Sequence, residues 1–389
     1  MNPITQWALF EYSTENIGDE IQSIAARRFL PHVDHMIDRD HLGEFRTTGE
    51  QQVGLIANAW YMHPPYAWPP RDPSVTPLLI SMHIDVKDPH VERVFSSSES
   101  LAYFERFGPV GARDTSTLNF LTHHGVDTWM SRCLTLTLSR DERIPTAEYI
   151  LAVDCPPDAV AALRQQTDRP IVHVSPYHMA NLERDERFRL AEFLLMLYQS
   201  AHTVVASRLH AALPCLAFDT PVLLVKTDTT FDEARFDGLT ELLHCSTPEE
   251  IIHGSNTYDV DHPPQNLQHY VPFRDRLVNV ATSYTGYDSV ATGQSIMSID
   301  PSTWSHDATF LSMFGKFLSD SYPSFVQHFN SDALVADLRH QLTRAEASDR
   351  DLAHLQDQMA ALLSSRSYRL GQALTSPIRL LRRLRARLF

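Results

Sequence analysis

The stretch AHTVVASRLHAALPCLAFDTPVLLV, residues 201–225, decides the fold class. Its apolar run at 203–206 predicts a buried parallel strand, a helix follows Arg208 and His210, and 221–225 predicts the next strand. In open α/β sheets, ligands bind at the carboxyl ends of the strands, and arginine matches carboxylate or phosphate with two parallel hydrogen bonds. The stretch therefore predicts an anion site beside a parallel sheet. A surface arginine beside a packed core histidine fits the pair alone equally well.

The alternation of apolar runs and helical patterns extends over most of the chain before residue 290. Further strands are expected at 7–10, 53–57, 78–82, 110–112 and 170–174, and helices at 16–30, 113–123, 187–200 and 248–253. We therefore expect an α/β protein with two Rossmann-like, doubly wound domains facing a cleft, at 1–150 and 151–290. The 389-residue length also suits two domains with appendages.

The C-terminal segments differ in kind. Residues 291–331 lack clear periodicity and are interpreted as a linker. Leucines recur at three- or four-residue steps over 332–364, which predicts a coiled coil that could join two copies, or a helix packed on its own globular body. The tail at 365–389 carries seven arginines and no acid. Its leucines share one helical face, so it suits an anionic membrane surface, or the acidic body of its own chain.

Composition excludes several classes of protein. The net charge of −15 argues against nucleic-acid binding. The four cysteines are scattered without a CxxC pair, which fits a reducing compartment and no structural zinc. The first residues resemble no signal peptide and no 18-residue apolar window is present. We therefore expect a cytoplasmic protein, held at the inner face of the membrane if its tail binds there.

Three short motifs follow predicted strands, and they are Asn16-x-Gly18-Asp19-x-x-Gln22, Gly111-x-Arg113-Asp114 and Arg208-Leu209-His210. Their order and spacing resemble the polysaccharide pyruvyl transferase family over about residues 8–245. The resemblance implies a two-domain fold similar to GT-B glycosyltransferases. It also implies transfer of a pyruvyl group from phosphoenolpyruvate to sugar hydroxyls, a reaction that forms a ketal. The acceptor is then a bacterial surface polysaccharide or its lipid-linked precursor. No cofactor is implied beyond this donor.

By the same resemblance, Arg208 and His210 line the donor pocket, and Arg113 binds the same anion. The residue types suit this chemistry. Phosphoenolpyruvate carries a carboxylate and a phosphate, so at least two cations are needed to hold it. His210 is the natural general acid or base, because histidine titrates nearest working pH. No metal is required by this scheme.

Further candidates for substrate binding surround these motifs. Asp19 either binds an acceptor hydroxyl or caps backbone N–H groups at a helix start. Asp114 either takes part in the site or only orients Arg113. Asn16, Gly18 and Gln22 shape the first loop, and Gly18 allows close backbone approach to a ligand.

The second half contributes Ser207, which ends its strand, and His178, which lies in a loop facing the same cleft. The family often places a cation after the strand at 221–225, and either Lys226 or Arg235 fits that position.

Departures from the family pattern leave other functions open. Ala57-Asn58-Ala59-Trp60-Tyr61 stands where the family has a Gly-rich stretch, and its aromatic rings could stack on a sugar. Asp38-Arg39-Asp40 has the spacing of metal-dependent sugar transferases, but it is interpreted as a solvated turn. The alternatives are a GT-B-type glycosyltransferase using a nucleotide sugar, and a non-catalytic glycan-binding or scaffold protein.

Overall fold

The computed structural model describes residues 3–49, 51–176, 182–227 and 232–301. The predicted coiled coil at 332–364 and the basic tail at 365–389 lie outside the described residues, as does His178. The predicted linker at 291–331 is described only as far as residue 301.

A parallel sheet forms the N-terminal half. Its strands lie in the order β2 (His35–Asp38), β1 (Ile4–Glu11), β3 (Gln52–Ile56) and β5 (Val75–Leu78). Two short parallel pairs continue this layer, β4 (Trp60–Tyr61) with β6 (His83–Ile84) and β7 (Val110–Ala112) with β8 (Thr128–Met130). The β7 pair joins the sheet because the Gly111 N–H donates to the Leu79 carbonyl at 2.8 Å.

The second sheet is also parallel throughout. Its order is β10 (Ile171–Val174), β9 (Ile150–Val153), β11 (Thr203–Ala206), β12 (Val222–Val225) and β13 (His244–Ser246). In this order the connections change direction between β9 and β11, and in the N-terminal sheet they change between β1 and β3. Ligands of open α/β sheets bind outside the carboxyl ends of the strands at such a point.

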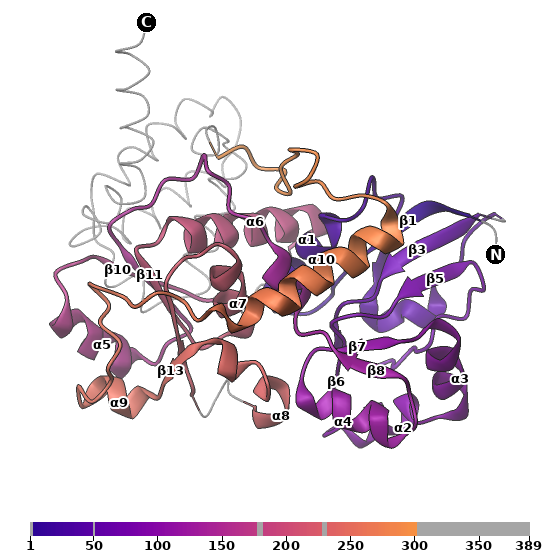
Figure 1. Ribbon diagram of the computed structural model, residues 1–389, viewed down its shortest axis with the longest axis horizontal. Coiled ribbons are helices and arrows are strands. Elements are labelled where there is room, and N and C mark those ends of the chain that lie inside the picture. Colours follow the sequence, from indigo (N-terminus) through magenta and orange to yellow (C-terminus); the bar gives the residue numbers. More distant parts are fainter. Residues whose placement is uncertain (1–2, 50, 177–181, 228–231, 302–389) are drawn as a thin grey trace, which may run out of the picture.

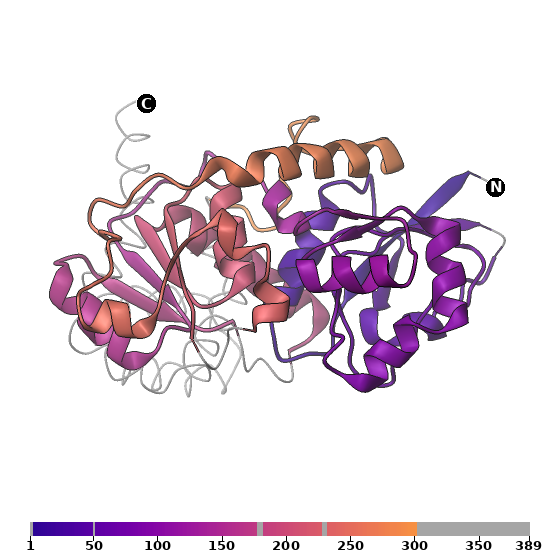
Figure 2. The same ribbon diagram turned by 60° about the horizontal axis from the view of Figure 1, so that its bottom comes forward.

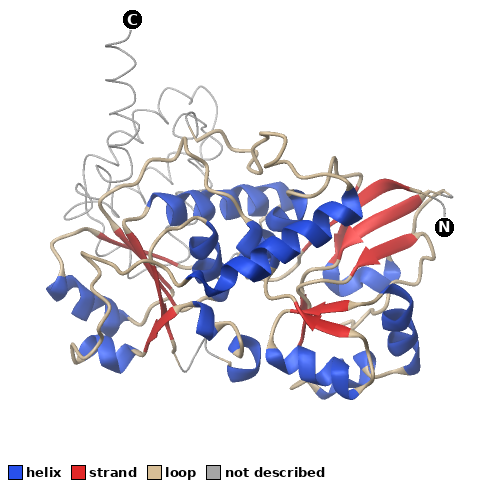
Figure 3. Cartoon of the chain, in the orientation of Figure 1, coloured by secondary structure: helices blue, strands red, loops and turns tan. Residues whose placement is uncertain are grey.

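Helices fill the space between the two groups of strands (Figure 3). Helix α1 (Gly18–Arg27) follows β1, yet it packs against α6 (Arg184–Ser200) and α7 (Leu209–Ala217) of the second half. The core is shared for the same reason, because Ile21 and Ile24 belong to one buried cluster with residues of α6 and α7. The two halves are therefore joined through an apolar interior.

The other helices cover the flanks of the sheets. They are α2 (Pro89–Phe95), α3 (Ser98–Phe107), α4 (Thr115–His123), α5 (Pro157–Gln166), α8 (Glu233–Phe236) and α9 (Pro248–Ile252), with the 3-10 turns η1 (Arg39–Glu44), η2 (Leu134–Thr137), η3 (Thr240–Leu242) and η4 (Gln268–Tyr270).

Helix α10 (Val271–Thr285) crosses from the second half to the first, as Figures 1 and 2 show. The Tyr284 hydroxyl accepts from the Leu55 N–H at 3.0 Å and donates to the Thr76 carbonyl, so it joins two strands of the N-terminal sheet. Just beyond the helix, Asp288 forms a bidentate ion pair with Arg28 at 2.7 and 2.8 Å.

Several elements confirm the sequence prediction, including the strand at Thr203–Ala206, the strand at Val110–Ala112 and the Thr247 cap of α9. The α/β class with parallel sheets is also confirmed. The strand predicted at 78–82 is wrong. The extended segment β5 instead ends at Leu78, and the backbone of Ser81 takes a φ of 54°, which no strand contains.

The solvated turn predicted at Asp38-Arg39-Asp40 is also wrong. Arg39 is fully buried, because its guanidinium lies over the rings of Tyr12 and Trp60 and pairs with Asp40 at 2.7 Å. Aromatic and carboxylate partners allow this arginine to be buried, whereas three consecutive charged residues indicate an exposed turn.

We expect Tyr284→Phe to lower the free energy of unfolding by about 1–3 kcal/mol, because it leaves the Leu55 N–H and the Thr76 carbonyl without their shared partner. Urea unfolding followed by circular dichroism measures the change. The matched control is Tyr287→Phe, whose hydroxyl bonds only the exposed side chain of Gln294. Equal stability of the Tyr284 variant and the wild type would contradict the role given to this hydroxyl.

Candidate anion site

The loop after β1 meets the segments after β10 and β11 at one place. The Ile17 N–H donates to the Pro176 carbonyl at 2.8 Å. A Cβ added at Gly18 would lie 3.3 Å from the Cβ of His210, and the side chain of Asn16 accepts the Gly18 N–H at 3.0 Å. The predicted loop residues therefore touch the predicted histidine, and the carboxyl ends of the two sheets share one region.

Arg208 lies where the connections between strands of the second sheet change direction, next to β9 and β11. It is the residue before α7, and its Nε donates to Asp154 Oδ2 at 2.5 Å. Asp154 directly follows β9, and the Ser207 hydroxyl donates to its backbone carbonyl at 2.8 Å. Sequence reasoning overlooked Asp154, although a carboxylate directly after a buried strand is a recognisable signal.

Arg113 is buried far more deeply than a cleft-lining residue. It follows β7, its side chain has no exposed surface, and its backbone N–H donates to the Met82 carbonyl at 2.8 Å. None of its three guanidinium nitrogens has a hydrogen-bond partner among the described residues, and a carboxylate oxygen of Asp114 lies 3.4 Å from Nε. Buried donors are normally satisfied, so these donors suit an anionic ligand.

Arg235, in α8, adds a third guanidinium to this region. Burial, together with the charges of Arg113 and Arg208, lowers its pKa to about 10, while Asp19 opposes the shift. Its Nε is also buried without a hydrogen-bond partner among the described residues. Lys226, the other cation left open by the sequence, instead acts on the pKa values of Cys245 and Glu250.

His210 lies within the field of these cations. Its side chain is buried, and its Nε2 has no hydrogen-bond partner in the part of the chain that the structure describes. Burial lowers the pKa of His210 well below the usual histidine value, and Arg113, Arg235 and His83 lower it further. The imidazole is therefore neutral near pH 7 and can accept a proton.

Asp19 lies in the first turn of α1 but does not cap this helix. Its carboxylate instead accepts from the Thr14 hydroxyl at 2.9 Å and from Gln22 Nε2 at 3.2 Å, and Arg39 Nη1 lies 3.8 Å away. The capping alternative is therefore wrong, because N–H groups of α1 are not its partners. Asp19 is held instead by side chains, and its charge reaches Arg235.

Asp114 has two partners besides the neighbouring arginine. One oxygen accepts the Thr117 N–H at 3.0 Å, which caps α4, and the other lies 2.6 Å from His83 Nδ1. His83 is a further member of the site that sequence reasoning missed, because its partner lies 31 positions away in the chain. The group formed by the partly exposed Arg235 and the buried residues Arg113, His210, His83 and Asp114 is called the cation cluster below.

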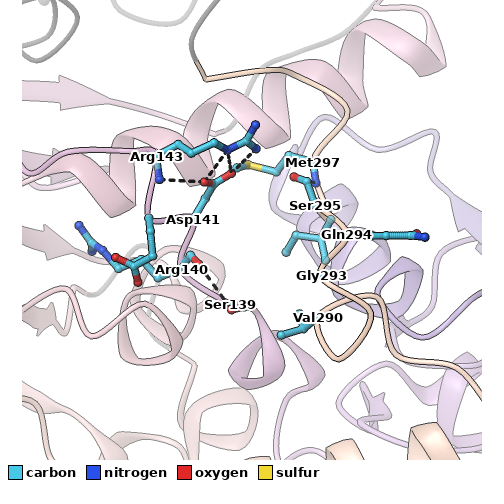
Figure 4. Close-up of a pocket in the computed structure, with 11 residues that line it drawn as sticks. Ser139, Arg140, Asp141, Arg143, Val290, Gly293, Gln294, Ser295 and Met297 are labelled. Atoms are coloured by element: carbon cyan, nitrogen blue, oxygen red, sulfur yellow. Dashed lines mark hydrogen bonds and ion pairs between the residues drawn. The ribbon is translucent and has the colours of Figure 1, made fainter. Parts of the chain in front are cut away.

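A separate pocket of about 440 Å³ lies between residues 139–143 and 290–297 (Figure 4). Its side chains are partly paired with each other, as in the 2.6 Å ion pair between Arg143 and Asp141. It contains none of the residues that the motifs single out.

Two features are absent from the described part of the chain. No group of three or more His, Cys, Asp or Glu side chains there is arranged to hold a metal ion. No helix there has both the length and the apolar character needed to cross a bilayer.

Comparisons with known proteins give likenesses among solved structures only. No family model matches the sequence, and no curated protein matches it. Among solved structures, the chain is similar to the UDP-GlcNAc 2-epimerase of Methanocaldococcus jannaschii in complex with UDP-GlcNAc and UDP. The two are 10% identical, the alignment covers 72% of this chain and 100% of that one, and the TM-score is 0.36. A likeness of this size concerns the α/β architecture alone.

We expect Arg113→Met to raise the free energy of unfolding by about 1–4 kcal/mol, because a buried charge without hydrogen bonds is replaced by an apolar chain of similar length. Urea unfolding measures the change. The control is Arg28→Met, which removes an arginine paired with Asp288 and should cost about 3–5 kcal/mol. Destabilisation of both variants to the same degree would show that Arg113 is a structural cation.

The lowered pKa of His210 predicts a pH dependence of stability. The pKa of an unfolded histidine is about 6.5. Below that pH, His210 binds a proton in the unfolded chain but stays neutral in the folded chain, because its pKa is lowered there. Stability should therefore fall with decreasing pH, by up to about 1.4 kcal/mol per pH unit for this one group. In His210→Gln the decline between pH 6.5 and 5 should be shallower by that amount, as measured by urea unfolding. An unchanged slope, equal to that of the exposed-site control His90→Gln, would contradict it.

Proposed function

We propose that this chain is a pyruvyl transferase that moves a pyruvyl group from phosphoenolpyruvate to sugar hydroxyls, forming a ketal on a bacterial surface polysaccharide or its lipid-linked precursor. The observation that carries the proposal is the fully buried guanidinium of Arg113, which has no hydrogen-bond partner among the described residues and lies beside Arg235 and His210. A buried charge without such partners destabilises the folded state unless an anion binds to it.

The charge pattern supports a donor with two acidic groups. Phosphoenolpyruvate carries a carboxylate and a phosphate on one carbon, and each can take two parallel N–H bonds from a guanidinium. Arg113 and Arg235 supply buried N–H groups for such bonds. Arg208 is positioned by Asp154 on the side of the second sheet. We therefore propose that these three arginines bind the carboxylate and the phosphate of the donor.

The neutral state of His210 suits the first step. The enol methylene must gain a proton, which makes the carbon bearing phosphate open to attack by a hydroxyl. Donor binding would bring negative charge beside His210 and raise its pKa, so the histidine would take up a proton and then deliver it. The arginines would stabilise the charge that grows on phosphate as it departs.

The acceptor sugar is assigned to the N-terminal side of the cluster. Asp19 is held by Thr14 and Gln22 and carries a carboxylate that can accept from a sugar hydroxyl. Its charge acts on Arg235, so it lies near the donor site.

Incubation of the full chain with phosphoenolpyruvate and a panel of simple or lipid-linked glycosides tests the proposal. Phosphate release that depends on the glycoside, together with a new methyl signal in the proton NMR spectrum of the product, is expected. Consumption of a nucleotide sugar in a parallel incubation, without use of phosphoenolpyruvate, would identify a glycosyltransferase instead. No turnover of either donor would favour a binding or scaffold protein.

Variants of the two motif residues refine the same assay. Arg208→Ala should abolish measurable phosphoenolpyruvate binding in calorimetry, whereas His210→Ala should retain binding and lose turnover by a factor of about 10²–10⁴. Undiminished donor affinity in Arg208→Ala would show that the anion lies elsewhere.

A further inference from the structure

A second histidine shares the cation cluster and is held in one orientation. His83 lies in β6 with 3% of its surface exposed, and its Nδ1 is 2.6 Å from Asp114 Oδ2. Asp114 is fully buried and is itself fixed by the N–H of Thr117. Because a carboxylate can only accept, we assign the His83 proton to Nδ1, which leaves the lone pair of Nε2 for another group.

The charges around His83 favour the neutral, basic form. Burial lowers its pKa, and Arg113 and Arg235 act in the same direction, while Asp114 opposes them. His83 in turn contributes to the lowered pKa of His210, so the two imidazoles lie within electrostatic reach of each other. The cluster thus combines two neutral histidines with two guanidiniums.

An aromatic platform borders this histidine. Trp60 of β4 is paired in register with His83, and their rings are stacked with centroids 6.5 Å apart and planes 23° apart. The indole is partly exposed, and it also contacts the ring of His63 at 4.5 Å. A half-exposed aromatic ring beside a base provides a flat apolar surface, which suits the face of a sugar.

The balance of protons in ketal formation calls for two transfers. Two sugar C–O bonds form at the central carbon of phosphoenolpyruvate, its bond to the phosphate oxygen breaks, and no oxidant or reductant is needed. Two hydroxyl protons are lost, of which one ends on the methylene carbon, making a methyl group, and the other leaves with phosphate. One histidine can deliver the first proton while another receives a proton from the attacking hydroxyl.

We propose that His83, oriented by Asp114, is the general base that takes the proton from the attacking sugar hydroxyl, and that the sugar lies against Trp60. This inference rests on the proposed function and adds a catalytic residue and an acceptor position to it. His210 then handles the proton of the methylene carbon, and Asp114 is a positioning residue.

The test uses His83→Gln in the phosphate-release assay. We expect kcat to fall by a factor of about 10²–10⁴, with the affinity for phosphoenolpyruvate and the acceptor KM within threefold of wild type. The matched control is His90→Gln, an exposed histidine of the same half that stacks on Tyr66 and should keep full turnover.

A second variant keeps the test decisive if His83→Gln does not fold. Asp114→Asn preserves a side chain that can cap α4, but its amide can donate to Nδ1 and favour the other tautomer. We expect a loss of kcat of at least tenfold, with thermal unfolding near that of wild type. Trp60→Leu should raise the acceptor KM by at least tenfold and leave donor affinity unchanged.

The outcomes separate the two proposals. If wild type turns over and a folded His83→Gln or Asp114→Asn variant does so within threefold, the role of His83 is overturned while pyruvyl transfer stands. If wild type releases no phosphate with any acceptor, the proposed function is overturned and this inference falls with it.

Discussion

The packing of α1 against the second half is the constraint on which the site depends. The helix follows the first strand of the N-terminal sheet, but its apolar residues are buried with those of α6 and α7. Gly18 begins this helix at a crowded position, since a Cβ there would lie 3.0 Å from Asn16 Oδ1 and 3.3 Å from His210 Cβ. One close contact therefore sets the position of the histidine of one sheet relative to the first loop of the other.

Burial of several cations is the energetic cost of this arrangement. Burial and the charges of Arg113 and Arg208 lower the pKa of Arg235, and the carboxylates of Asp114, Asp154 and Asp19 oppose this positive charge. An enzyme gains from such a cluster because its donors are already oriented and need not reorganise when charge develops on a ligand. The surrounding apolar core, which joins both halves, stabilises the fold and offsets the cost of burying these charges.

The two histidines of the cation cluster come from different halves of the chain. His210 belongs to α7 and is set by the contact with Gly18, whereas His83 belongs to β6 and is set by Asp114. Both have lowered pKa values because burial disfavours the charged imidazolium and the arginines repel it. Under the proposed function, a negatively charged donor would reverse the second effect, so that its binding would favour proton uptake by the histidines.

The amino-acid sequence by itself determined the parallel-sheet class and the motifs at its edge. Local apolar runs define β11, and the residues that follow a strand must lie at its carboxyl end, so Arg208 and His210 could be placed in advance. Tertiary structure decided the rest. The pairing of His83 with Asp114, the choice of Arg235 near Arg113 and the burial of Arg39 each join segments far apart in the chain, and the approach of such segments depends on long-range packing that no local pattern encodes.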